Sequence, residues 1–343
     1  MVYKQKIKQQ LQNARLYFSL KQTWKLKNIR KLARVKKLVL PRKLTNQEAS
    51  DHKIAFISHY NKYGKIQQCI MRLIESLKES NYEVLILSEF LNLVSLQWCA
   101  AEGVGFMIRK NQGRDFGAFQ DAWLSLAQKL NQIQCTNLIL LNDSVYPLEN
   151  LTKTSWGSFL KGANDQVLGL TDSYQNGYHL QSYALNIPKL VLNKDWWNNF
   201  WLNYPSWGGT AMAIKYGEIG LSQLFTKNNI QLSAIHSITD VRSYSASEEF
   251  FNKLKDSCSA LASEIIFKTI GQTMNQSISK ISPTHHLAVP LLMMGFPFIK
   301  RDLLEANESL CIDPLLIISF KNNWVNKSEL PEFLKPKLIG YKN

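Results

Sequence analysis

The sequence contains no hydrophobic run long enough to cross a bilayer. Its longest apolar stretch, residues 287–299, is thirteen residues long and is interrupted by Pro290 and Pro297. A membrane-spanning helix needs about 20 apolar residues. The N-terminus also lacks the short apolar segment and cleavage site that characterise a secretory signal. We therefore expect an intracellular protein.

Cysteine is scarce, and its spacing excludes the usual cysteine sites. The five cysteines are odd in number and show no C-x-x-C spacing. This pattern is typical of reduced thiols in a cytosolic protein rather than of a disulfide framework or a zinc site. No H-E-x-x-H motif is present either, so we expect no metal cage built from cysteine or histidine.

Acidic residues are absent from the first 45 positions, which carry fourteen Lys or Arg. That leaves 27 of the 41 basic side chains for the rest of the chain, against 26 acidic ones. The body is thus nearly neutral although the net charge is +15. Apolar residues, among them Phe18 and Trp24, recur at helical spacing in this basic head. We predict a basic amphipathic helical segment that ends at Pro41 and a linker, together residues 1–50.

Three interpretations suit such a basic head. The first is binding to an anionic membrane surface, because each Lys or Arg near the headgroups contributes about 1 kcal/mol. The second is a solvated basic tail without a partner, and the third is binding to nucleic acid. We favour the membrane surface for residues 1–45, because apolar residues are interleaved with the charges. We expect no nucleic acid, since the rest of the chain is nearly neutral.

From residue 53 onward, short apolar runs alternate with segments of helical periodicity. The pattern is a buried strand, then a helix with one apolar face, then another strand, and it repeats. This pattern predicts an α/β fold with a mostly parallel sheet flanked by helices. The predicted strands are residues 54–58, 82–87, 105–109 and 138–141, and the predicted helices are residues 64–80 and 116–130.

Polar residues follow three of these strands, and ligands of open α/β sheets bind beyond the carboxyl ends of the strands. Ser58 and Tyr60 follow the first strand. Asn111, Gly113, Arg114 and Asp115 follow the third and open a helix. A glycine loop, an arginine and a helix start suit a diphosphate, although Arg114 and Asp115 could equally be ordinary surface charges.

The fourth strand ends in Asn142, Asp143 and Ser144. Oxygen ligands at a strand tip can hold a divalent cation such as Mg²⁺ or Mn²⁺, with phosphate and water completing the shell. The alternative is a turn or helix cap, which the same residue types favour. Both interpretations remain open at this point.

The order of these segments resembles the rhamnan synthesis protein F family of bacterial polysaccharide glycosyltransferases. The likeness covers residues 54–305 and excludes the basic head. Its motifs are N-x-G-R-D-x-G-A at residues 111–118, N-D-S at 142–144, and the segments 168–173, 178–183, 216–222, 283–285 and 295–301.

The resemblance implies a GT-A-like catalytic domain with a divalent metal, over residues 51–240, and a helical C-terminal region, residues 241–343, packed on it. It places a metal at Asn142, Asp143 and Ser144, although this motif has one carboxylate where two are usual. Ser58, Tyr60, Asn111, Gly113, Arg114 and Asp115 would bind the donor. Glu218, at the start of a helix predicted over residues 218–227, would be the catalytic base, with Asp172 as the runner-up. A carboxylate at a helix N-terminus is also a common structural arrangement.

His179, Gln181 and Trp207 are candidates for contacts with the acceptor or the sugar, although His179 could equally be a structural residue. Trp197 and Trp201 lie at helical spacing and are expected in the core.

The implied function is inverting transfer of a sugar, with rhamnose favoured, from a nucleotide-diphosphate donor such as thymidine-diphosphate rhamnose. The acceptor would be a lipid-linked cell-surface polysaccharide, and the enzyme would lie on the inner face of the cell membrane. The alternative is a non-catalytic assembly or binding module that keeps the fold.

Overall fold

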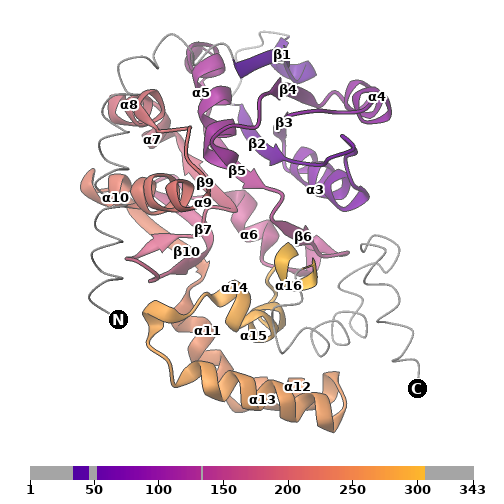
Figure 1. Cartoon of the computed structure of the whole chain (residues 1–343), viewed down its shortest axis with the longest axis vertical. Coiled ribbons are helices and arrows are strands. Elements are labelled where there is room, and N and C mark those ends of the chain that lie inside the picture. Colours follow the sequence, from indigo (N-terminus) through magenta and orange to yellow (C-terminus); the bar gives the residue numbers. More distant parts are fainter. Residues whose placement is uncertain (1–33, 46–51, 133, 306–343) are drawn as a thin grey trace, which may run out of the picture.

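The computed structural model describes residues 34–45, 52–132 and 134–305, which form an α/β fold around a mixed, mostly parallel sheet (Figure 1). The strand order is β1-β4-β3-β2-β5-β9-β7-β10, with β8 beside β7. The strands are β1 (Val35–Val39), β2 (Lys53–His59), β3 (Tyr82–Ser88), β4 (Gly105–Arg109), β5 (Asn137–Asn142), β7 (Gln166–Ser173), β8 (His179–Leu180), β9 (Ala184–Pro188) and β10 (Gln231–His236).

Strands β4, β3, β2 and β5 are parallel to one another, and β9 runs antiparallel between β5 and β7. Every residue of β3 and β5 is buried, which is why these strands are continuous apolar runs rather than alternating ones. The four predicted strands are confirmed, and no end differs from the prediction by more than one residue. Their parallel order brings four carboxyl ends to one edge of the sheet.

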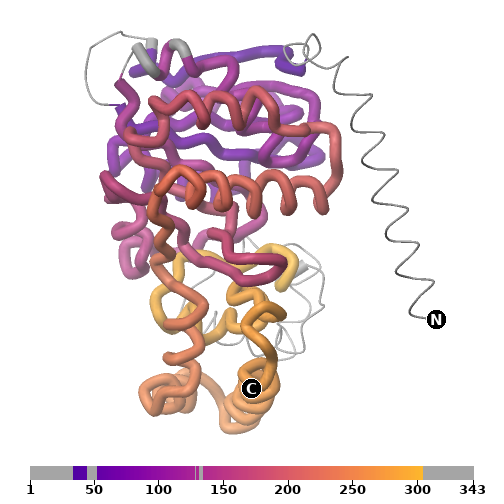
Figure 2. Tube along the Cα trace, turned by 90° about the vertical axis from the view of Figure 1, so that its left-hand side faces the viewer, coloured from indigo at the N-terminus to yellow at the C-terminus, as the bar shows by residue number. Residues whose placement is uncertain are grey.

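Helices cover both faces of the sheet, as the turned view shows (Figure 2). One face packs against α3 (Gln68–Glu79), α4 (Leu93–Glu102) and α6 (Trp156–Lys161). The other packs against α5 (Arg114–Gln132), α7 (Lys189–Leu192), α8 (Asp195–Asn203) and α10 (Gly220–Lys227). The two predicted helices are confirmed as α3 and α5. In α3 the buried residues recur every three or four positions, so the helix presents one apolar stripe to the sheet.

Aromatic residues of α8 form part of the core. Trp197 and Trp201 are both fully buried, as expected from their spacing. The ring of Trp197 lies 5.5 Å from Trp123 and 5.3 Å from Trp201, in edge-to-face geometry. Such pairs contribute about 1 kcal/mol beyond the burial of their area.

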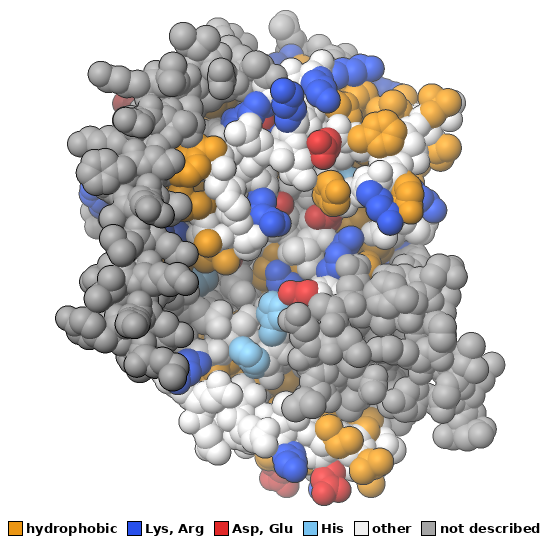
Figure 3. Space-filling view, viewed as in Figure 1, with side chains coloured by type: hydrophobic (Ala, Val, Ile, Leu, Met, Phe, Trp, Pro, Cys, Tyr) orange, Lys and Arg blue, Asp and Glu red, His pale blue; other side chains and the backbone are white. Residues whose placement is uncertain are grey.

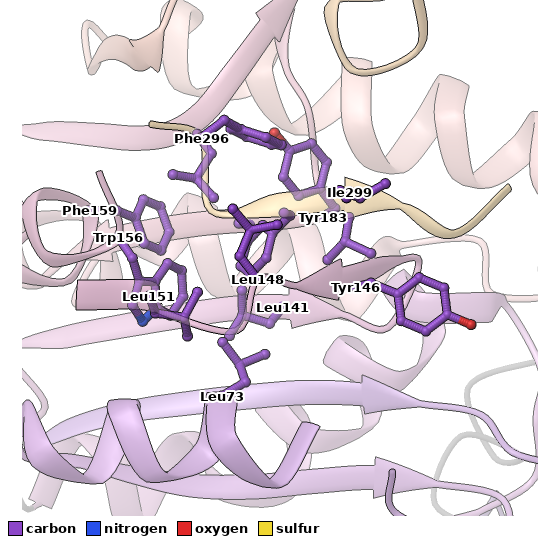
Figure 4. Close-up of a cluster of buried hydrophobic side chains, with 14 of the residues drawn as sticks. Leu73, Leu141, Tyr146, Leu148, Leu151, Trp156, Phe159, Tyr183, Phe296 and Ile299 are labelled. Atoms are coloured by element: carbon purple, nitrogen blue, oxygen red, sulfur yellow. The ribbon is translucent and has the colours of Figure 1, made fainter. Parts of the chain in front are cut away.

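A two-stranded antiparallel ribbon joins distant parts of the chain beside the sheet. It pairs β6 (Val145–Pro147) with β11 (Phe298–Lys300). Apolar side chains from the sheet, α6 and this ribbon pack together in the cluster of Figure 4, where Tyr183 and Phe296 meet edge-to-face at 6.1 Å. The pairing of β11 with β6 places Lys300 opposite Val145, close to the end of β5.

The described part of the C-terminal region is helical apart from β11 and lies below the sheet in Figure 1. Ser237, Ser247 and Ser259 cap three of these helices, each accepting a hydrogen bond from the third backbone N–H that follows. Residues 306–343 lie outside the described part. The helices are α11 (Ile238–Ser245), α12 (Glu248–Ser257), α13 (Ala260–Met274), α14 (Pro283–His286), α15 (Ala288–Met293) and α16 (Arg301–Glu305).

The end of the basic head differs from the prediction. Residues 1–33 lie outside the described part, but Val35–Val39 is strand β1, antiparallel to β4, where we expected a helix. The predicted linker after Pro41 contains α2 (Arg42–Thr45), whose Leu44 is buried. The free backbone groups on the edge of β4 explain the error, because pairing with them outweighs the local helical pattern.

Within residues 34–45, 52–132 and 134–305, no helix combines the length and the apolar character needed to span a bilayer.

Candidate functional site

A cleft opens at the carboxyl ends of the parallel strands and has two chambers. The larger, of about 970 Å³, reaches from the tip of β5 to the C-terminal helices. The smaller, of about 580 Å³, lies over the ends of β2, β3 and β4. Arg114, Asp115 and Ser144 line both chambers and so form their common wall. Histidine, acidic and basic side chains meet near the centre of this face (Figure 3).

The loop that leads into α5 has an unusual backbone at the common wall. Gly113 and Arg114 both have positive φ, +79° and +51°. A Cβ on Gly113 would lie 2.6 Å from the carbonyl oxygen of Ser206, so only glycine fits there. For Arg114 the left-handed conformation is strained, and such strain clusters at functional sites. The turn leaves Arg114 exposed in the cleft at the N-terminus of a long helix, where anions are favoured.

A buried ion network supports this loop from below. Asp121 accepts hydrogen bonds from Arg109 Nε at 2.6 Å and from Arg34 Nη2 at 2.5 Å. Arg109 also donates to the carbonyl oxygen of Gln112 at 2.5 Å, which holds the loop. Arg34 belongs to the basic head, yet it is buried in the fold. Arg34 is therefore engaged within the fold, and the membrane prediction for residues 1–45 stays a prediction.

The three residues at the tip of β5 are held by hydrogen bonds in two groups, Asp143 with the end of β2 and Asn142 with Ser144. The Oδ2 atom of Asp143 accepts the backbone N–H of Tyr60 at 2.7 Å, and its own N–H donates to the carbonyl oxygen of Ser58 at 3.1 Å. The Oδ1 atom of Asn142 accepts from the backbone N–H and the hydroxyl of Ser144, at 3.1 and 2.6 Å. Asn142 thus caps the turn, whereas Asp143 lines the smaller chamber.

Asp115 supplies a second carboxylate beside Asp143. Its oxygens accept hydrogen bonds from Ser58 Oγ at 3.0 Å and from Asn142 Nδ2 at 2.8 Å. Burial, and then the negative charge of Asp143, raise the pKa of Asp115 to about 6. Asp115 stands in the first turn of α5, far in sequence from the N-D-S motif, so the motif alone shows one carboxylate where the fold places a second beside it.

These carboxylates, rather than the whole N-D-S motif, fit a divalent cation. Asp115 and Asp143 repel each other, and Mg²⁺ is commonly held by one or two carboxylates with phosphate oxygens and water. The side-chain oxygen of Asn142 is already engaged. Within the described ranges, His, Cys, Asp and Glu side chains form no group of three or more that could hold a metal ion unaided.

Lys300 is a site residue that sequence reasoning missed. Its Nζ donates to Ser144 Oγ at 3.0 Å and lies 4.8 Å from the centre of the Tyr183 ring, inside the larger chamber. Burial lowers the pKa of Lys300, and the charge of Glu218 opposes this effect. The segment 295–301 belongs to the resemblance, but nothing in its sequence indicates which strand tip it reaches.

Glu218 lines the larger chamber together with Arg114 and Ser144, and its local structure differs from the prediction. It stands in a π-helical segment, Ala213–Ile219, that continues into α10, and therefore not at a helix start. Its Oε1 accepts the backbone N–H of Ser182 at 2.7 Å, and its Oε2 lies 4.0 Å from His179 Nε2. π-Helical segments are frequent at functional sites.

His179 is buried and faces Glu218. Its Nδ1 lies 2.8 Å from the carbonyl oxygen of Gly177, which only accepts, so Nδ1 carries a proton and Nε2 points to the carboxylate. Gln181 lines the same chamber, and its Oε1 accepts from the hydroxyl of Thr171.

Two predicted residues lie elsewhere. Asp172 is buried, and its Oδ1 accepts the N–H of Ile238 at 2.7 Å, so it caps the first turn of α11. Trp207 is half-buried. Neither is among the described residues that line a chamber.

The C-terminal helices close the far side of the larger chamber with polar side chains. Gln272 of α13 and Gln276, which follows that helix, line it together with His285. The Nε2 atom of His285 lies 2.9 Å from Asp302 Oδ2, and its Nδ1 lies 3.0 Å from Ser282 Oγ. Hydroxyl, amide and imidazole groups of this kind are suited to hydrogen bonding a polyhydroxylated ligand.

Comparisons with known proteins add distant relatives. No protein-family profile matches the chain. The chain is 28% identical over 233 residues to virulence protein VirA of Vibrio anguillarum, an alignment that covers 66% of this chain and 70% of that protein. It is 24% identical over 138 residues to the uncharacterized protein y4gN of Sinorhizobium fredii, covering 39% of this chain and 35% of that protein. Neither name identifies a reaction.

Proposed function

We propose that this protein is a GT-A-type glycosyltransferase of the rhamnan synthesis protein F kind. It transfers a sugar, with rhamnose favoured, from a nucleotide-diphosphate donor to a lipid-linked cell-surface polysaccharide. One observation carries the proposal. Two carboxylates, an arginine and a half-buried lysine share a cleft at the carboxyl edge of a parallel sheet with a third carboxylate, Glu218.

The two chambers suit the two halves of such a donor. The smaller chamber, with Ser58, Tyr60 and Asn111 on its walls, would hold the nucleoside. The common wall would face the diphosphate, with Arg114 as a bidentate cation at the start of α5. The larger chamber would hold the sugar and the acceptor. A volume of about 970 Å³ is ample for both.

Leaving-group stabilisation would come from fixed positive charge. Arg114 and Lys300 both line the larger chamber, and they would face the oxygens on which negative charge develops as the bond to the sugar breaks. Asp115 and Asp143 would hold a divalent cation, which would supply further charge to the same oxygens.

Glu218 would act as the general base. It would take the proton from the acceptor hydroxyl as that oxygen bonds to the anomeric carbon on the face opposite the diphosphate, which gives inversion. The bond from Ser182 N–H orients its carboxylate, and His179 Nε2 stands next to the second oxygen. Asp172 is the weaker candidate because it caps α11.

The test combines donor binding and transfer. Calorimetry with nucleotide diphosphates and Mn²⁺, followed by a panel of nucleotide sugars, is expected to reveal binding and transfer by the wild-type protein. Glu218→Gln keeps an oxygen for the Ser182 N–H, so donor binding should persist while transfer falls about 1,000-fold. Asp172→Asn is the matched control. Retained transfer by Glu218→Gln would contradict the assignment of the base.

A second candidate is a non-catalytic assembly module. The engagement of Asn142 and Ser144 in hydrogen bonds with other protein groups favours it, because Asp143 is then the one carboxylate that the motif contributes to the cleft. Such a module need not bind nucleotide diphosphate or Mn²⁺, so the same calorimetry separates the two candidates.

The basic head would hold the enzyme on the cytoplasmic face of the membrane. Since Arg34 and β1 belong to the fold, a deletion that tests this idea should stop at residue 33. The shortened protein should bind anionic vesicles more weakly than the full chain at moderate salt but still transfer sugar to a soluble acceptor. Undiminished vesicle binding would refute the anchor.

A further inference from the structure

Large apolar side chains gather on the surface beside the smaller chamber, over α4 and the ends of β2 and β3. Figure 3 shows this group at the upper right, with basic side chains among it. We call it the loop patch. Its members, with their exposed fractions, are Tyr60 54%, Tyr63 68%, Phe90 53%, Leu93 69% and Val94 70%.

The loop patch is held by a defined framework of two loops. The backbone N–H of Asn92 donates to the carbonyl oxygen of Gly64 at 2.9 Å, and its Nδ2 donates to that of Tyr63 at 3.3 Å. Asn92 Oδ1 accepts from Ser95 N–H and thereby caps α4. Gly64 has φ +64°, and a Cβ there would lie 2.5 Å from the ring of Phe90. The apolar side chains are therefore presented outward by a braced backbone.

Positive charge accompanies these apolar groups. Lys62 and Lys65 are exposed on the same loop, and Lys62 Nζ lies 4.7 Å from the centre of the Tyr63 ring. Aromatic and aliphatic side chains interleaved with lysines are suited to the boundary between acyl chains and anionic headgroups. Two copies of this chain that paired through the patch would instead bring the Lys62 and Lys65 side chains of both copies together.

We infer that the loop patch docks the folded domain on an anionic membrane surface, independently of the basic head. The apolar side chains would enter the headgroup region, and Lys62 and Lys65 would meet the lipid charge. Tyr60 belongs to the patch and also lines the smaller chamber, and its backbone N–H is bonded to Asp143. Docking would thus hold the mouth of the cleft beside the bilayer. This last step rests on the proposed function, in which a lipid-linked acceptor is anchored there.

The test uses the full chain and vesicles with and without phosphatidylglycerol in phosphatidylcholine. The double variant Leu93→Gln/Val94→Gln is compared with Leu261→Gln/Ile265→Gln, which removes exposed apolar groups from α13. We expect the first to partition about tenfold or more weakly and the second to match the wild type. Lys62→Gln/Lys65→Gln should weaken binding to the anionic vesicles alone.

Hydrogen exchange on the wild-type protein tests the same inference without any variant, and so does not depend on whether a variant folds. On the wild-type protein, vesicles should slow hydrogen exchange in residues 90–95 but not in α13. Equal binding by all variants, with no local protection, would assign membrane binding to the head and overturn the inference. Two other results for Leu93→Gln/Val94→Gln would also overturn the inference, provided that vesicle binding is unchanged. A change in oligomeric state would show that the patch contacts a second copy of the chain. A loss of thermal stability would show that the patch contacts another part of the same chain.

Discussion

Replacing Asp115 by asparagine should stabilise the metal-free protein at neutral pH. Burial and the charge of Asp143 raise the pKa of Asp115 from 3.8 to about 6. A raised carboxyl pKa means that the folded state disfavours the ionised form, so the penalty is present above about pH 6 and absent below about pH 4. Folding stability should therefore fall as the pH rises through this window.

The size of the effect follows from the shift and the hydrogen bonds. Two pKa units correspond to about 3 kcal/mol, which Asp115→Asn removes at pH 7. The carboxamide has one acceptor oxygen in place of two, so either Ser58 Oγ or Asn142 Nδ2 loses its partner, at a cost of about 1 kcal/mol. The variant should thus be about 2 kcal/mol more stable at pH 7 and slightly less stable near pH 4.

Urea denaturation in EDTA, at several pH values from 4 to 7, measures the difference between variant and wild type. Other carboxylates titrate in both proteins and cancel from this difference. Asp195→Asn, which removes an exposed carboxylate from the first turn of α8, is the control and should not stabilise. A difference that stays constant with pH, or an Asp115→Asn protein that is less stable at pH 7, would refute the electrostatic reasoning.

Further predictions concern other parts of the site. Lys300→Gln keeps a donor for Ser144 but loses the charge, and we expect transfer to fall at least about 100-fold in a rate assay with little change in melting temperature. Asp172→Asn weakens the cap of α11 and should cost about 1 kcal/mol in urea denaturation, with transfer retained. Asp121→Asn leaves two buried guanidinium groups poorly compensated and should cost about 3–5 kcal/mol. Gly113→Ala should lower both stability and donor affinity in calorimetry, because its φ of +79° and the nearby backbone leave no room for a Cβ.

The sequence by itself determined the layered α/β fold and the edge of the sheet at which chemistry is expected. Apolar runs of strand length predict strands buried on both faces, and segments with one apolar stripe predict helices that cover them. Together these two patterns indicate a parallel sheet between layers of helices. The polar residues after those strands, among them Asp143 and Arg114, follow from the same reasoning, since parallel strands end together.

Only the tertiary structure decided which distant residues complete the cleft. Lys300 reaches Ser144 across 156 positions of sequence, through a ribbon whose pairing no local pattern specifies. Arg34 and β1 join the fold because the edge of β4 offers backbone partners, which the helical pattern of the head does not reveal. Asp115 becomes the second carboxylate because α5 carries it to the tip of β5. Periodicity reports which face of an element is buried, whereas contacts between elements depend on how those faces are packed together.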